Sequence, residues 1–287
     1  MRECAGMSLD DSDKRGSLGP WTRISARTTR SVMSRTGSRR GDGSSSHGRR
    51  SCCAAIFLAP ARVLDVGGGP GAYAAWLADL GYAVHLVDPV PLHVEQAAEA
   101  ARVQGRRFTV AHGDACRLEQ DAGSFDAVLL LGPLYHLVER RDRLQALAEA
   151  HRVLTRGGLI AVATISRFAS IIDGLARGLL RHPEFRSIVE KDLRSGEHRN
   201  PTAIPLAFTT AFFHRPDEIH AEVVDAGFAL DALYGIEGAA GWFAPTTPPD
   251  ERSADYERLL WVARAVEQEP SLLGGSAHLL AVGHTLD

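Results

Sequence analysis

Short apolar runs alternate along the chain with longer segments in which apolar residues recur every three or four positions. The apolar runs occupy residues 61–66, 84–87, 125–131 and 159–165, and a short, half-polar strand is expected at 107–111. Helical spacing marks residues 71–80, 91–104 and 140–154. A short apolar run without polar alternation is typical of a strand that is buried on both faces, as in parallel sheets joined by helices. The pattern therefore predicts an α/β fold with a doubly wound, mostly parallel sheet, whose ligand crevice lies at the carboxyl ends of the strands.

The regular alternation lapses after Ser166. Further helices are expected at residues 168–180, 216–226 and 253–268, with loop and a short helix at 181–213. Further strands are expected at residues 228–234 and 277–282. The pattern predicts two largely helical insertions, residues 167–214 and 235–271, that cap the crevice.

The first 55 residues have a different composition from the rest. They are rich in Ser, Arg and Gly and nearly free of periodic apolar residues. Such a segment cannot bury enough apolar surface to offset the entropy of ordering, so we predict a disordered arm at residues 1–55 and one domain at 56–287.

Composition narrows the classes of function. The 287-residue chain is 45% hydrophobic and carries a formal net charge of −3, which argues against nucleic acid as its main partner. It contains no apolar stretch of the roughly 20 residues that a membrane-spanning helix needs. The four cysteines match neither a zinc nor a disulfide spacing, so we expect a cytoplasmic protein without a bound metal.

The strongest chemical signal is the glycine-rich segment that follows the first apolar run. Gly67, Gly69 and Gly71 let a ligand lie against the backbone, at the start of a helix whose N–H groups point toward it. Asp65 lies two residues before these glycines, where it can organise the turn and bind a ligand ammonium. Asp88 ends the next apolar run, where an acidic side chain can bind the hydroxyls of a ribose or simply start a turn before Pro89.

These features, taken with later motifs in order, resemble the class I S-adenosylmethionine (SAM)-dependent methyltransferases over residues 61–164. The motifs are Asp-x-Gly-x-Gly-x-Gly at 65–71, Asp88, Gly-Asp-Ala at 113–115, Ser-Phe-Asp-Ala-Val at 124–128, Leu-Gly-Pro-Leu-Tyr-His at 131–136 and Arg-Val-Leu-Thr-Arg-Gly-Gly at 152–158. The resemblance implies a Rossmann-like sheet of seven strands, mostly parallel with an antiparallel last strand. It also implies SAM as cofactor and methyl transfer to an O, N or C nucleophile, which we expect to belong to a small molecule.

The resemblance assigns roles to particular residues. It implies that Gly67 and Gly69 line the methionine part of SAM, that Asp88 binds the ribose, and that Asp114 with Ala115 meets the adenine. Leu131 and Gly132 are then expected to form the wall where the methyl group meets its acceptor.

Residues with ionisable or phenolic side chains near the crevice are candidates for catalysis and substrate binding. Tyr135 and His136 follow the fourth strand, and His136 is either a general base or a packing histidine. Arg167, His198 and His214 fall in or beside the first insertion and are candidates for substrate contact, with surface or loop roles as the alternative.

Two other functions fit part of the pattern. A nicotinamide-dependent oxidoreductase is compatible with Gly67-x-Gly69-x-x-Ala72, although Asp65 is unusual for the strand of such a site. A catalytically silent protein that kept the SAM-binding fold is the second alternative. Calorimetry with SAM and with NADH separates the three hypotheses.

Overall fold

The computed structural model describes residues 62–103, 108–201, 210–243 and 254–286. The predicted disordered arm at residues 1–55 lies outside these ranges, as do Cys4, Cys52 and Cys53. That part of the prediction is therefore not tested by the structure.

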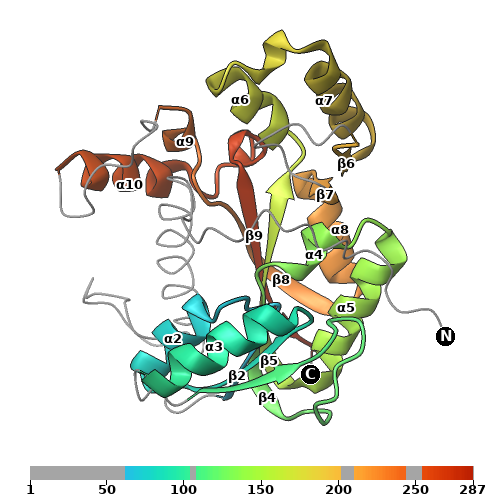
Figure 1. The fold of residues 1–287 in the computed structure, drawn as a ribbon, viewed down its shortest axis with the longest axis vertical. Helices are drawn as coiled ribbons and strands as arrows, with labels where there is room; N and C mark the ends of the chain where they lie inside the picture. The colour runs from blue at the N-terminus through green and yellow to red at the C-terminus, as the bar shows by residue number, and fades with distance from the viewer. Residues whose placement is uncertain (1–61, 104–107, 202–209, 244–253, 287) are drawn as a thin grey trace, which may run out of the picture.

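The described strands form one sheet with a parallel core (Figure 1). Its strands are β1 (Arg62–Val66), β2 (Ala83–Asp88), β3 (Phe108–His112), β4 (Phe125–Leu130), β5 (Leu154–Ser166), β6 (Glu197–Arg199), β7 (Thr210–His214), β8 (Phe228–Gly235) and β9 (His278–Thr285). The first five strands are parallel neighbours in the order β3-β2-β1-β4-β5. β9 then pairs antiparallel with β5 and with β8. The predicted Rossmann-like sheet with an antiparallel last strand is confirmed, but the described residues form nine strands rather than the seven expected.

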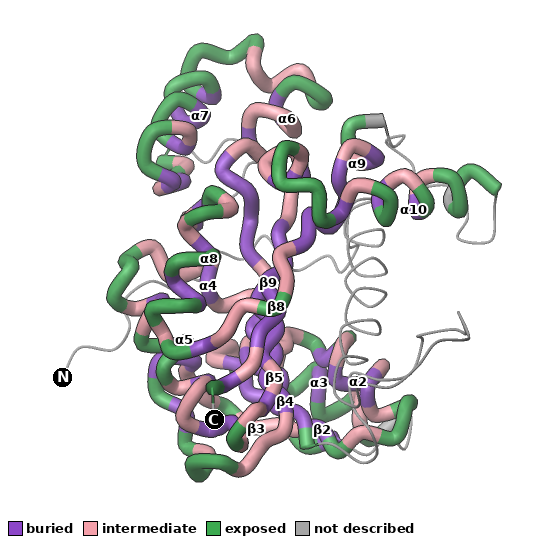
Figure 2. The backbone as a smooth tube through the Cα atoms, turned by 180° about the vertical axis from the view of Figure 1, so that it is seen from behind, coloured by how far each residue is buried: buried purple, intermediate pink, exposed green. Residues whose placement is uncertain are grey.

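Helices cover both faces of the sheet and extend beyond its carboxyl-end edge. They are α2 (Ala72–Asp79), α3 (Pro91–Val103), α4 (Pro133–His136), α5 (Arg140–Val153), α6 (Ala169–Ala176), α7 (Pro183–Ser195), α8 (Pro216–Asp225), α9 (Ala240–Phe243) and α10 (Ala254–Val266), with 3-10 turns η3 (Leu179–Arg181) and η4 (Leu273–Gly275). On one face, α2 and α3 bury Leu77 and Ala97 against Val63 and Leu280. On the other face, α5 and α8 contribute to a second core. The inner strands β1, β2 and β4 are mostly buried, as Figure 2 shows, which explains why most of their residues are apolar.

β5 is the longest of the described strands, and it pairs with different strands along its length. Its first part pairs with β4, while Ile165 and Ser166 at its end pair with β7. β7 in turn pairs antiparallel with β6, so a short hairpin extends the sheet beyond the end of β4. The helix predicted within residues 181–213 is present as α7, although it is 13 residues long. The prediction of loop was wrong at β6 and β7, because this hairpin depends on an edge that β5 supplies from elsewhere in the chain.

Two classes of feature are not found among the described residues. None of the helices in these ranges has both the length and the apolar character that crossing a membrane requires. The same ranges hold no group of three or more His, Cys, Asp or Glu side chains placed to bind a metal ion.

Candidate cofactor site at the glycine turn

The turn between β1 and α2 has the backbone conformation that its glycines predict. Gly67, Gly69 and Gly71 have φ angles of 68°, 56° and 86°, a region that side-chain-bearing residues rarely adopt. The Gly67 N–H donates to the Val87 carbonyl at 2.7 Å, which joins the turn to the end of β2. The turn therefore lies at the carboxyl ends of neighbouring parallel strands.

The glycines of this turn have different surroundings. A Cβ atom on Gly67 would lie 2.7 Å from Cγ of Pro133, so Gly67 allows the turn to pack against the start of α4. A Cβ atom on Gly69 would meet no described atom within 4 Å. Gly69 thus presents bare backbone on an open side, the arrangement in which a ligand can approach the main chain.

Asp65 is buried beneath this turn, with 1% of its surface exposed. It accepts a hydrogen bond from the backbone N–H of Ala74 in α2. Its Oδ2 atom has no hydrogen-bond partner among the described residues. Burial, helped by the nearby charge of Asp88, raises the pKa of Asp65 to about 7. A buried acceptor without a donor is costly, so this oxygen marks a place where a ligand donor or cation would be stabilised.

Asp88 braces the same turn from the end of β2. Its Oδ2 accepts the Gly69 N–H at 2.8 Å, and its Oδ1 accepts the Val90 N–H at 2.9 Å. Nδ1 of His93 lies 3.1 Å from the same Oδ1. The turn-starting role that the sequence allowed is thus observed. A carboxylate oxygen can accept two hydrogen bonds, so Oδ2 retains one acceptor position for a ligand hydroxyl.

Asp114 and Ala115 follow β3, which pairs with β2 on the side away from β1. Oδ1 of Asp114 accepts the backbone N–H of Cys116 at 2.9 Å, and Asp114 forms an isolated bridge with Arg117. Ala115 is buried in the core beside α5. The half-buried Asp114 therefore shapes the loop after β3 at the carboxyl-end edge of the sheet.

The segment after β4 approaches the glycine turn directly. A Cβ atom on Gly132 would lie 3.3 Å from the Gly67 carbonyl oxygen and 3.6 Å from the Tyr135 hydroxyl oxygen. The rings of Tyr135 and His136 are in contact, with centroids 4.7 Å apart. The structure thus places Gly132 beside the turn and near Tyr135, and Leu131 precedes Gly132 in the chain.

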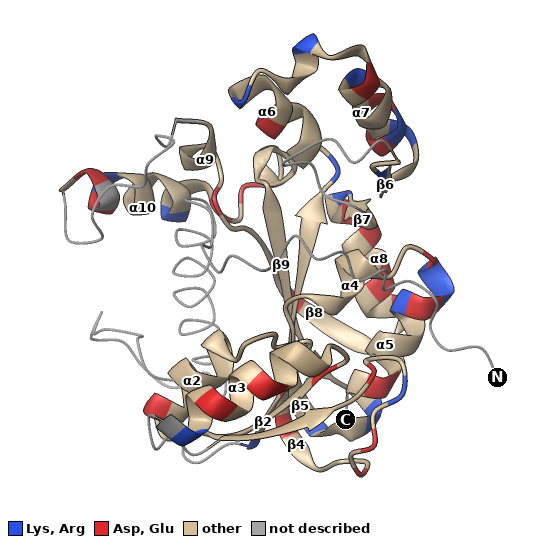
Figure 3. Ribbon diagram, in the orientation of Figure 1, with Lys and Arg blue, Asp and Glu red and all other residues tan. Residues whose placement is uncertain are grey.

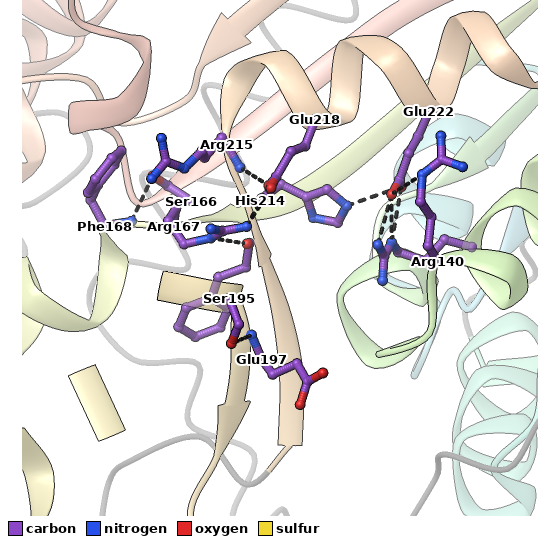
Figure 4. A network of polar contacts seen from close by, with 12 residues as sticks. Arg140, Ser166, Arg167, Phe168, Ser195, Glu197, His214, Arg215, Glu218 and Glu222 are labelled. Atoms are coloured by element: carbon purple, nitrogen blue, oxygen red, sulfur yellow. Dashed lines mark hydrogen bonds and ion pairs between the residues drawn. The ribbon is translucent and has the colours of Figure 1, made fainter. Parts of the chain in front are cut away.

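Arg167, His198 and His214 lie elsewhere, in the protein interior. Nε of Arg167 donates to the Phe213 carbonyl at 2.8 Å, and its Nη2 binds Glu218 (Figure 4). His198 is hydrogen-bonded to Asp192 at 2.8 Å and stacks on the ring of Phe213. His214, with no exposed surface, lies 3.2 Å from Oε2 of Glu222. These contacts give all three residues structural partners, so we leave them out of the proposed substrate site.

Arg143 and Glu222 form a buried ion pair in the same region, which the sequence did not reveal. Nη2 and Nε of Arg143 donate to Glu222 at 2.8 and 3.0 Å, and Nη1 donates to the Leu137 and Val138 carbonyls. Burial alone would raise the pKa of Glu222, but hydrogen bonds from His214 and Arg143 hold it below its ordinary value. Burial lowers the pKa of His214. The network joins α5 and α8 to β7, and thereby anchors the first insertion to the sheet (Figure 4).

Glu237, which follows β8 in the chain, is a second buried carboxylate that the sequence analysis missed. It contacts the first residue of β9. Glu237 is 1% exposed, and its Oε1 lies 2.6 Å from Nδ1 of His278. Its Oε2 accepts the Ser276 hydroxyl at 2.8 Å and the His278 N–H at 2.9 Å. Glu237 and His278 are 41 positions apart, and no local sequence pattern connects them.

Comparison with known proteins identifies the domain that carries the glycine turn. A family model described as a methyltransferase domain matches residues 63–158. A malonyl-[acyl-carrier protein] O-methyltransferase from Geobacter sulfurreducens is 36% identical over 171 residues, which are 59% of this chain and 56% of that protein. A ubiquinone biosynthesis O-methyltransferase from Maricaulis maris is 36% identical over 107 residues, which are 37% of this chain and 41% of that protein. The chain thus spans about half the length, or less, of these curated relatives.

A solved structure extends the similarity to the fold as a whole. The crystal structure of a SAM-dependent methyltransferase from Methanosarcina mazei superposes with a TM-score of 0.54 at 16% identity, covering 80% of this chain and 94% of that one. At such low identity the likeness concerns the fold alone. Residues 63–158 thus match a methyltransferase domain, and the described sheet has the fold of a solved SAM-dependent methyltransferase.

Proposed function

We propose that this protein transfers a methyl group from SAM to an O, N or C nucleophile of a small molecule. The observation that carries the proposal is the pair of buried acids at the glycine turn. Oδ2 of Asp65 has no donor among the described residues, and neither Asp65 nor Asp88 forms an ion pair with a described Lys or Arg. A cationic ligand with an ammonium and a sulfonium would supply the missing positive charge.

The donors and acceptors around the turn fit the parts of SAM. We assign the ammonium of its methionine part to Asp65 and a ribose hydroxyl to the remaining acceptor position on Oδ2 of Asp88. The other proposed cofactor contacts are the backbone of Gly67, Gly69 and Gly71, Asp114 with Ala115 near the adenine, and Leu131 with Gly132 near the methyl group. Each of these residues belongs to the carboxyl-end edge of the sheet or the turn above it.

When bound, SAM supplies a methyl group on a sulfonium, which an aligned nucleophile can displace. The work left to the protein is to orient the acceptor, exclude water and accept a proton where the acceptor carries one. Tyr135 lies beside the turn and is proposed to orient the acceptor, with His136 in ring contact with it. Alignment alone can lower the barrier of such a reaction by several kcal/mol, on the order of 7 or more in well-oriented systems.

The type of acceptor and the compartment are also proposals. A small molecule is favoured because the chain carries a net negative charge, which disfavours nucleic acid, and because one relative is named for ubiquinone biosynthesis. We propose the cytoplasm as the compartment, where thiols such as that of the buried Cys116, which donates to the Asp142 carbonyl, stay reduced.

The two rival hypotheses make different predictions for ligand binding. A nicotinamide dinucleotide would bring its anionic pyrophosphate toward Asp65 and Asp88, where like charges repel. A silent binding protein would bind SAM without transferring its methyl group. Isothermal titration with SAM and with NADH, followed by screening of cell extracts for products labelled from radioactive SAM, separates these cases.

A matched pair of glycine variants tests the site itself. Gly69 and Gly123 both have positive φ angles, 56° and 65°, and a Cβ atom on either would meet no described atom within 4 Å. Gly69→Ala and Gly123→Ala should therefore cost similar stability, about 1–2 kcal/mol from the backbone conformation. Only Gly69→Ala should weaken SAM binding, by about tenfold or more. Equal SAM affinity in both variants, or tight binding of NADH by the wild type, would refute the proposed function.

A further inference from the structure

β9 carries a histidine–carboxylate pair at each of its two ends. At its beginning, His278 binds the buried Glu237, and near its other end Nδ1 of His284 lies 3.0 Å from the exposed Asp231. β9 runs antiparallel to β5, so its first residue lies at the edge where β1, β4 and β5 end. The first pair therefore lies at the same edge as the glycine turn, and the second lies at the opposite edge.

The strand register places His278 near the end of β4. Val162 of β5 pairs with Leu130 of β4 on one side and with Ala281 of β9 on the other. His278, which pairs with Ile165, is three residues further along, at the level where the chain leaves β4 through Leu131 and Gly132. β4 and β9 flank β5, and two strand spacings amount to about 10 Å. A small molecule can span this distance from the proposed position of the methyl group.

His278 and Asp65 also project from the same face of the sheet. Side chains alternate along a strand, so His278 shares the face of Leu280, and Asp65 shares the face of Val63. Leu280 and Val63 belong to one core cluster, together with residues of α2. The edge of the sheet, the strand register and the face of the sheet therefore all place the imidazole of His278 on the side where SAM is proposed to bind.

Glu237 orients the imidazole of His278 and stabilises its protonated form. The carboxylate is nearly inaccessible and accepts three hydrogen bonds, from Nδ1–H and the backbone N–H of His278 and from Ser276. The Ser276 hydroxyl oxygen in turn accepts the N–H groups of Glu237 and Gly238. Because Nδ1 donates to Glu237, Nε2 is the basic ring atom. The His278 side chain, 36% exposed, remains open to a reactant.

Among the described residues, the elements around this histidine carry the buried titratable residues Tyr234 and Glu267. β5 places Ile165 opposite His278, β8 places the buried Tyr234 opposite Leu280, and the turn after α10 brings the backbone carbonyl of Glu267 to Gly235. Burial alone would lower the pKa of His278, but the charge and hydrogen bond of Glu237 raise it above the ordinary value. The same contacts hold the pKa of the Glu237 carboxyl below its ordinary range.

We propose that His278, oriented by Glu237, is the general base of this enzyme and that the methyl acceptor is an acidic hydroxyl of a phenol or enol. This inference rests on the proposed methyltransferase function. The hydroxyl proton moves to Nε2 of His278 as the O–CH₃ bond forms and the S–CH₃ bond of the sulfonium breaks. The sulfur leaves as a neutral thioether, and Glu237 stabilises the imidazolium that results.

The acidity of the acceptor decides which substrates need such a base. A phenol has a pKa of about 10, within reach of a histidine, whereas a carboxylate at neutral pH has no proton to remove and an aliphatic alcohol holds its proton far more tightly. A histidine held by a carboxylate therefore matches a phenol-type hydroxyl better than either of the other oxygen nucleophiles.

Methylation of catechol and of the more acidic 4-nitrocatechol with radiolabelled SAM tests the proposal. His278→Gln should lower kcat for catechol by about 10²–10⁴-fold, the range for loss of a general base. The loss should be tenfold or less for 4-nitrocatechol at a pH where this probe is already ionised. His284→Gln, at the other end of β9, is the matched control and should change kcat by less than about twofold for either probe.

Other measurements keep the outcomes distinct. SAM affinity, measured by calorimetry, should be the same in wild type and His278→Gln, whereas failure of the wild type to bind SAM would refute the proposed function instead. Equal losses for both probes, no loss, or no methylation of either probe by a wild type that binds SAM would overturn this inference. In the wild type itself, kcat for catechol should rise with pH through the titration of His278, and this rise should be absent for ionised 4-nitrocatechol.

Discussion

Two regions of the molecule bury carboxylates, the glycine turn and the network beneath α8, and their surroundings differ in charge. At the turn, Asp65 and Asp88 are buried near each other and receive backbone N–H groups. Beneath α8, Glu222 receives the guanidinium of Arg143 and the imidazole of His214. The pKa of Asp65 is raised to about 7, whereas the pKa of Glu222 is lowered.

We propose that the difference separates a ligand site at the turn from a structural contact beneath α8. A buried carboxylate with a permanent cation beside it is compensated within the fold and connects the elements that contribute the two partners. A buried carboxylate without one is destabilised until something positively charged arrives. We therefore expect changes to the network to alter stability, and changes to the turn to alter SAM binding.

The largest expected effect is the removal of the guanidinium beneath α8. Arg143→Met keeps much of the side-chain volume but removes the bidentate donor of Glu222, which retains His214 and the more distant Arg140, and leaves the Leu137 and Val138 carbonyls without the Arg143 donor. Such a change should lower the free energy of unfolding by about 3–5 kcal/mol. Urea denaturation at neutral pH measures this loss, and a loss below about 1 kcal/mol would contradict the structural role of the network.

The second largest expected effect is the pH dependence of stability that Asp65 causes. The folded protein holds the Asp65 proton up to about pH 7, whereas the unfolded chain releases it near pH 4. Stability contributed by this group is therefore present at low pH and falls as the pH rises from about 4 to 7, by up to a few kcal/mol. Asp65→Asn lacks this titration, so the stability difference between variant and wild type should change over that range and level off above it.

The same titration should be visible in SAM binding. A cation placed beside Asp65 favours its ionised form, so binding near pH 6–7 should release protons and strengthen as the pH rises toward 8. Calorimetry in buffers with different ionisation enthalpies measures the protons released. Identical proton release by wild type and Asp65→Asn would mean that Asp65 does not meet the ligand cation.

The smallest expected effect comes from an exposed ion pair. Arg62 and Asp126 join the starts of β1 and β4 with their side chains 50% and 37% exposed. Arg62→Met should cost less than about 1 kcal/mol, because solvent screens the charges. Urea denaturation of Arg62→Met and Arg143→Met under the same conditions compares the two losses of unfolding free energy. Similar losses would mean that burial does not make the Arg143–Glu222 pair more important than the exposed pair.

Much of the architecture was predictable from local sequence. The short runs of mainly apolar residues predicted β1 through β5, because strands that are buried on both faces are mostly apolar. The glycines at 67, 69 and 71 indicated a turn with positive φ angles, and the structure has that turn. Asp65 and Asp88 were expected at its edges because each ends or nearly ends a strand run.

Only the tertiary structure decided which ionisable side chains meet. Arg143 and Glu222 are 79 positions apart, Glu237 and His278 are 41 apart, and both pairs form where separate elements pack together. Arg167, His198 and His214 suggested substrate contacts by residue type, yet packing gave each of them a protein partner. The sequence determined the inner strands and the glycine turn, because these follow from local backbone preference and apolar patterning. Which charges are neutralised, and which remain for a ligand, depends on long-range packing that no local pattern records.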